Sequence, residues 1–138
     1  MAAQHGEAGA LGALAVLHLW WATGSAWPLA DQATLADAVA GRTTVPSPAA
    51  CVGVAAALSA ASALVAGRPS PGWPLQRAGA TGVVAVLSVR GALGLAGRTH
   101  IVAPGSSSPR FRQLDRRYYA PLCLGIAALA SPAARSTQ

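Results

Sequence analysis

Charged residues are scarce in this 138-residue sequence, and lysine is absent altogether. Charged side chains make up 10% of the chain, whereas a soluble domain has about a quarter. So few charges cannot cover the surface of a soluble domain, and 53% of the residues are apolar. The composition therefore excludes an ordinary soluble globular protein and predicts an integral membrane protein surrounded by lipid.

Cysteines and catalytic groupings are also scarce. The two cysteines, Cys51 and Cys123, fit neither a CxxC motif nor the spacing of a zinc site. They are predicted to be buried thiols or, if their Cα atoms come within about 7 Å, a disulfide. The sequence contains no nucleophile–base pair, carboxylate dyad or phosphate-binding loop. We therefore predict no catalytic residue, no metal site and no cofactor.

Acidic residues number only four, so the formal net charge is +6. A basic chain can bind nucleic acid, but this one has no soluble basic face, and we predict no nucleic-acid partner. Membrane lipids with anionic headgroups are the expected partners. The abundance of Ala, Gly, Pro and Arg, without Lys or Asn, indicates a GC-rich bacterial coding bias. The predicted location is therefore the bacterial inner membrane.

Long apolar runs make up most of the chain. They predict membrane spans at about residues 8–27, 49–66, 78–97 and 118–134, close to the roughly 20 helical residues that cross a bilayer core. No basic segment precedes the first run, so we interpret it as a retained span rather than a cleaved signal. The predicted fold is all-α: an integral membrane four-helix bundle forming one domain over residues 1–138.

The loops between these runs carry the charges and the breaks. Residues 29–40 are predicted to form a short surface helix that ends at Gly41. Residues 67–77, which include Trp73, are predicted to form a turn without regular structure at the level of the lipid headgroups. Ser108 and Pro109 predict the start of a helix. Phe111, Leu114 and Tyr118 would share one face of this short amphipathic helix, lying in the interface before the last span. Pro121 is predicted to kink or restart that span, and Pro132 to end it.

The unusual side chains are predicted to gather in one half of the membrane, because the first and third loops share a side. Ionisable groups within a membrane suggest function, and the candidate ligand- or lipid-binding residues are His18, Trp21, Arg90, Asp115, Arg117 and Tyr119. Simpler roles stay open: His18 could be a packing donor, and Tyr119 a residue of the aromatic belt. We predict that Asp115 is held by arginine, with Arg90 as its principal partner and Arg112, Arg116 and Arg117 competing.

Two stretches carry a family resemblance: HLWWATGSAW at residues 18–27 and FRQLDRRYYAPLCL at residues 111–124. The second contains residues that match an Arg–Leu–Asp–x–Arg–x–Tyr–x–Pro–Leu–Cys pattern, among them Asp115, Arg117, Tyr119, Pro121, Leu122 and Cys123. The chain thus resembles DUF3995, a family of small bacterial four-span membrane proteins of unknown function. After Arg90 it departs from the family, since RGALGLAGRTHIV lacks the acid that usually follows. The resemblance implies a fold and a location but no activity.

Function is open among three hypotheses, of which the third is one half of a dimeric transporter. The leading one is a non-enzymatic interaction or lipid-associated membrane component; the alternative is a membrane enzyme or carrier that binds an amphipathic anionic or quinone-like ligand near Arg90. A membrane-protein partner or a homo-oligomer also stays open, because small residues such as Ala56 and Ala60 permit close helix contact. Six arginines in the first and third loops against three on the opposite side predict that these loops are cytoplasmic. Both termini would then lie outside.

Overall fold

The computed structural model describes residues 2–68 and 74–135, which form helices and turns and contain no strand. The four long helices are α1 (Ala2–Ala22), α3 (Pro48–Val65), α4 (Pro74–Leu95) and α6 (Ala120–Arg135). Between them lie α2 (Gln32–Ala40), the 3₁₀ turn η1 (Thr99–Ile101), α5 (Pro109–Leu114) and the π-helical turn η2 (Asp115–Tyr119). The predicted all-helical class is confirmed.

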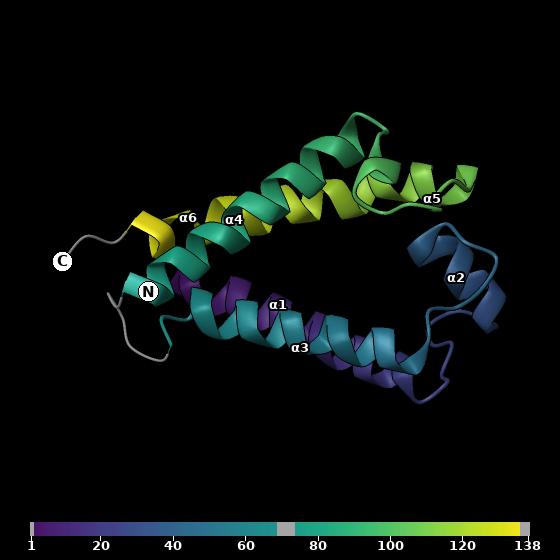
Figure 1. Cartoon of the computed structure of the whole chain (residues 1–138), viewed down its shortest axis with the longest axis horizontal. Helices are drawn as coiled ribbons and strands as arrows, with labels where there is room; N and C mark the ends of the chain where they lie inside the picture. Colours follow the sequence, from purple (N-terminus) through teal and green to yellow (C-terminus); the bar gives the residue numbers. More distant parts are fainter. Residues whose placement is uncertain (1, 69–73, 136–138) are drawn as a thin grey trace.

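The long helices pack as two pairs, α1 along α3 and α4 along α6 (Figure 1). The pairs meet in an apolar core near the end that holds both termini, where Leu11, Val65, Ile126 and Ala130 are buried together. At the opposite end the pairs diverge, and α2 and α5 lie there. We call this second end, comprising α2, η1, α5 and η2, the cap end.

Two helices, α3 and α4, are long and apolar enough to cross a membrane. The apolar part of α1 is shorter, Ala8–Ala22, and α6 has only 16 residues. The first helix ends at Ala22 rather than at Trp27 because the chain turns at Thr23 and Gly24, where the glycine takes a φ of 90°. Length and hydropathy therefore single out two of the four predicted spans.

Helix starts and stops follow local chemistry. The hydroxyls of Ser47 and Ser108 accept hydrogen bonds from the backbone N–H groups of Ala50 and Phe111, at 3.2 Å and 3.0 Å, and a proline follows each cap. The predicted start of α5 is thus confirmed. By contrast, the prediction that residues 67–77 lack regular structure is wrong for 74–77, because Pro74 begins α4; Trp73 lies outside the described residues.

One of the two prolines of the last span behaves differently from the prediction. Pro132 lies inside α6, which continues to Arg135, so the prediction that it ends the helix is wrong. Its fixed φ is compatible with a helix, and only one hydrogen bond is lost near the helix end. Upstream of Pro121 the chain forms the π turn η2, in which Ala120 N–H bonds to the carbonyl of Asp115. The helix therefore runs on from α5 into α6 without a break.

The π turn also changes which residues face inward. Phe111 and Asp115 are buried and Tyr119 is half-buried, whereas Tyr118 is 53% exposed. The predicted face of Phe111, Leu114 and Tyr118 is therefore wrong at Tyr118, because a wider turn carries Tyr119 into its place.

Candidate functional site

An ion pair between α4 and η2 organises the α4–α6 side of the cap end. Nη2 of Arg90 lies 2.8 Å from Oδ1 of Asp115, and Nη1 lies 3.3 Å from Oδ2. The Asp115 side chain is 1% exposed and that of Arg90 24%. Bidentate pairing of this kind joins charge and geometry. The predicted contact between Arg90 and Asp115 is confirmed.

A buried hydroxyl completes this site. Thr99, 2% exposed at the start of η1, donates its hydroxyl hydrogen to Oδ2 of Asp115. Each carboxylate oxygen of Asp115 therefore has at least one donor, which a buried carboxylate requires. The three residues tie α4, η1 and η2 together, and we call them the Asp115 network.

Glycines on α4 bring the helices close enough for the Asp115 network to form. A Cβ at Gly94 would lie 2.6 Å from Cβ of Ala120 and 3.0 Å from Oδ2 of Asp115. A Cβ at Gly91 would lie 2.6 Å from Cγ of Leu124. No side chain larger than hydrogen fits between α4 and α6 at these positions without a shift.

The other arginines predicted to compete for Asp115 point elsewhere. Arg112, Arg116 and Arg117 are exposed. The guanidinium of Arg117 lies 5.6 Å from the ring centre of Tyr118, within the range of a cation–π contact. The guanidinium of Arg116 lies over Gly97, where an added Cβ would be 2.5 Å from Nη2.

Hydrogen bonds to backbone carbonyl groups hold helix α2 against α5 and η2. The Tyr119 hydroxyl donates to the carbonyl of Ala38 at 3.1 Å, and the Ser107 N–H donates to the carbonyl of Gly41 at 3.2 Å. Phe111 packs so closely on Gly41 that an added Cβ would lie 2.9 Å from the ring. Gly41 also has a φ of 64°, which favours glycine. Tyr119 therefore anchors α2.

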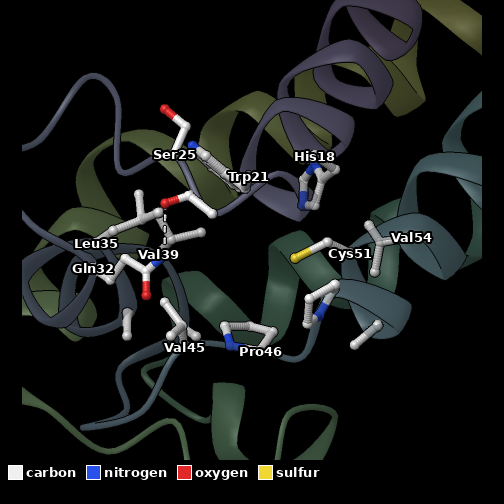
Figure 2. A pocket seen from close by; sticks show the side chains of 15 residues that line it. His18, Trp21, Ser25, Gln32, Leu35, Val39, Val45, Pro46, Cys51 and Val54 are labelled. Atoms are coloured by element: carbon white, nitrogen blue, oxygen red, sulfur yellow. Dashed lines mark hydrogen bonds between the residues drawn. The ribbon is translucent and has the colours of Figure 1, made fainter.

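A pocket of about 310 Å³ lies between α1, α2 and α3 (Figure 2). His18 and Trp21 come from α1, Leu35 and Val39 from α2, and Cys51 from α3, with the linker residues Val45 and Pro46 on another side. Figure 2 shows His18 above Cys51, whose sulfur points into the pocket. The walls are mostly apolar side chains.

His18 is fixed by two contacts. Its Nδ1 lies 2.8 Å from the carbonyl oxygen of Leu14, and its ring meets the Trp21 ring edge-on, with centroids 5.0 Å apart. Trp21 is fixed in turn, because its indole N–H donates to the carbonyl of Trp27 at 2.8 Å. These two rings form one wall of the pocket.

The structure thus does not bring the six predicted site residues into one site. His18 and Trp21 line the pocket on the α1–α3 side, together with Cys51, whereas Arg90 and Asp115 form the Asp115 network on the α4–α6 side. Tyr119 bridges α2 and η2, and Arg117 is exposed beside Tyr118. Cys51 and Cys123 are free thiols, and no cluster of metal-binding side chains occurs in residues 2–68 and 74–135.

Residues of three types at these sites were not predicted from the sequence. Thr99 in the network and Gln32 in the pocket gave no signal, since each is a single polar residue in a loop or helix start. Gly91 and Gly94 follow Arg90 at helical spacing, and this pattern of small residues could have indicated the close α4–α6 approach.

Fold and site together define an all-helical protein with two paired helical layers, a buried ion pair and an apolar pocket at one end. A family model matches residues 11–130, and the chain belongs to that family, DUF3995, described as a protein of unknown function. Neither a curated protein nor a solved structure matches the chain.

Proposed function

We propose that this protein is a multi-pass integral membrane protein of the bacterial cell membrane, with α1, α3, α4 and α6 crossing the bilayer as a four-helix bundle. The observation that carries the proposal is the exposure of apolar side chains on all four helices. Val16 on α1 is 64% exposed, Val52 on α3 48%, Val86 on α4 68% and Leu129 on α6 49%. In water these exposed apolar side chains would be unfavourably hydrated, whereas in a bilayer they would contact apolar lipid chains.

Burial supports this proposal for the two most apolar helices. Only 17% of the residues in the apolar windows of α3 and α4 are buried, whereas the core helix of a soluble protein would be mostly buried. Between Arg77 and the end of α4, Arg90 is the only charged side chain, and Asp115 neutralises it. Pairing lowers the cost of a charge in lipid.

The cap end carries the charge that would meet the headgroups. Six exposed arginines lie in its elements or within two residues of them, and we call this group the basic end: Arg42, Arg98, Arg110, Arg112, Arg116 and Arg117. Trp20 and Trp27, 56% and 64% exposed, lie next to the cap end, as interfacial aromatics do. We propose that the basic end faces the cytoplasm and associates with anionic lipid headgroups, each arginine contributing about 1 kcal/mol near the surface.

Retention of lipid by the purified protein tests this association. Native mass spectrometry from detergent should show phosphatidylglycerol retained in preference to phosphatidylcholine. Replacing Arg110, Arg112 and Arg116, half of the basic end, by Gln should clearly reduce that preference. The control replaces Arg68 and Arg135, exposed at the opposite end, and should keep it. Equal retention of both lipids by the unaltered protein would contradict the proposed lipid association.

The alternative of an anionic ligand at Arg90 is disfavoured by the geometry. The Arg90 guanidinium is bound by Asp115 at 2.8 Å, and Arg90 does not line the pocket beside His18. Asp115 engages two of the five N–H donors of Arg90 and neutralises its charge, so this site offers an anion little net attraction.

A further inference from the structure

The pocket between α1, α2 and α3 has no role in the proposed lipid association at the basic end, and its lining residues indicate what it could bind. Its volume of about 310 Å³ is at the lower end of the range for small-molecule sites, roughly 300–1,000 Å³. None of the residues that line it is Asp, Glu, Lys or Arg. A charged ligand would lose its hydration there without gaining an ion partner. The pocket therefore selects for an uncharged and largely apolar occupant.

His18 supplies a hydrogen-bond acceptor to this pocket. Its Nδ1 lies 2.8 Å from the Leu14 carbonyl oxygen, and because a carbonyl can only accept, Nδ1 must carry the proton. In the neutral ring Nε2 then bears a lone pair and accepts. Among the hydrogen bonds of the described residues, none involves Nε2 of His18.

Two donors in the pocket wall are already engaged: Nε2 of Gln32 donates to the carbonyl of Gly24 at 2.6 Å, and the indole of Trp21 donates to the carbonyl of Trp27. The Ser25 hydroxyl accepts from the backbone N–H of Trp27 at 3.2 Å and keeps its own hydrogen to donate, as does the weaker Cys51 thiol. The acceptors in the wall are Nε2 of His18 and the amide oxygen of Gln32. A ligand that binds to the His18 acceptor must therefore bring a hydrogen-bond donor of its own.

We propose that this pocket binds an uncharged, largely apolar alcohol or phenol. Its hydroxyl donates to Nε2 of His18, and its apolar body lies against Trp21 and Val54 (Figure 2). The contacts of His18 with the Leu14 carbonyl and the Trp21 ring orient the acceptor before the ligand arrives, which reduces the entropy lost on binding. None of the arginines of the basic end lines this pocket, so the test of ligand binding and the test of lipid preference have independent outcomes.

Three naphthalene probes of similar size test the proposed chemistry. The full chain is placed in lipid nanodiscs and dialysed against radiolabelled 2-naphthol, 2-methoxynaphthalene or 2-naphthoate, and uptake by empty nanodiscs is subtracted. We expect saturable 2-naphthol binding at one site per chain. Losing the donor in the methyl ether should weaken binding by about three- to tenfold, and the anion should bind more weakly still. Equal, non-saturable uptake of the naphthol and the ether would overturn the proposal.

Two variants assign the binding to His18. His18→Phe keeps an aromatic ring but removes the acceptor, and it should bring 2-naphthol binding down to the level of the ether. His100→Phe changes an exposed histidine that does not line the pocket and should bind as the unaltered chain does. Unchanged 2-naphthol affinity in His18→Phe would overturn the proposal.

Cys51 provides a readout in the unaltered pocket, should His18→Phe fail to fold. Cys51 lines the pocket as a free thiol and is 6% exposed. In a Cys123→Ala protein, 2-naphthol should slow the modification of Cys51 by methyl methanethiosulfonate severalfold, and the methyl ether should slow it less. Equal modification rates with and without 2-naphthol would show that the pocket does not hold the phenol.

Discussion

Arg90 and Asp115 lie 25 residues apart in the chain, yet the Arg90 guanidinium holds both carboxylate oxygens of Asp115, at 2.8 Å and 3.3 Å. Thr99 supplies a further donor to one of these oxygens. The pair connects α4 with the η2 turn that leads into α6, and each of the two charges is paired with the other. Its energetic consequence is that the two residues should behave as a unit.

Coupling between these residues is the first prediction. Asp115→Asn should lower the free energy of unfolding in mild detergent by about 3 kcal/mol, because it leaves a half-buried guanidinium without its counter-charge. Arg90→Leu in the same chain should restore part of this loss. Thermal unfolding of the single and double variants measures the coupling, and additive effects would show that the residues are independent.

Gly94 and Gly82 form a matched pair for the second prediction. Gly94→Ala should destabilise the protein, because the new methyl group would lie 2.6 Å from Cβ of Ala120 and 2.9 Å from Nη1 of Arg90. Gly82→Ala lies on the same helix with nothing within 4 Å of the added Cβ. It should stabilise α4 by about 0.5–1 kcal/mol. Similar melting temperatures for the two variants would contradict close packing of α4 on α6.

The third prediction concerns the attachment of α2. Tyr119→Phe removes the hydrogen bond to the carbonyl of Ala38 and should cost about 1 kcal/mol. It should also speed amide hydrogen exchange in α2, since the helix loses an anchor. Tyr118→Phe is the control, because Tyr118 is 53% exposed and contacts Arg117 through its ring face. Faster exchange in α2 of both variants alike would contradict a specific role for Tyr119.

A pH dependence follows from Asp31, the N-cap of α2. The backbone N–H of Thr34, with its hydroxyl, donates to the Asp31 carboxylate and lowers its pKa from the ordinary value of 3.8. A lowered folded-state pKa adds stability above the ordinary pKa, and this stability is lost as pH falls through the folded value. NMR titration should show both the lowered pKa and fraying of α2 at low pH. Asp31→Asn retains a capping side chain and should remove this pH dependence; fraying at the same pH in that variant would contradict the assignment to Asp31.

The sequence predicts helices well here because the signals are local. Ser108 with Pro109 starts α5, and Gly41 ends α2, as expected from their capping chemistry. The Arg90–Asp115 contact could also be predicted, because a carboxylate next to the last span was available to offset an arginine inside the third. The helix ends and the ion pair could be predicted because few residue types can cap a helix and only four acidic residues are available to pair with Arg90.

The π turn at residues 115–119 and the pocket could not be predicted in the same way. A single extra residue per turn rotates Tyr119 inward in place of Tyr118, and no local propensity marks that change. The pocket depends on how α2 folds back over the ends of α1 and α3, which is a tertiary arrangement. For this reason the sequence predicts a common half of the membrane for His18 and Arg90, whereas the structure shows that they belong to two separate sites.

The central claim is that the long helices cross a membrane with the cap end on one side. Single cysteines at four exposed positions test it most directly: Thr43, Ala66, Ser107 and Arg135, in a chain carrying Cys51→Ala and Cys123→Ala. An impermeant maleimide applied to intact cells should label positions 66 and 135, and label positions 43 and 107 only after permeabilisation. Labelling of all four positions in intact cells, or release of the chain by alkaline carbonate, would contradict the claim.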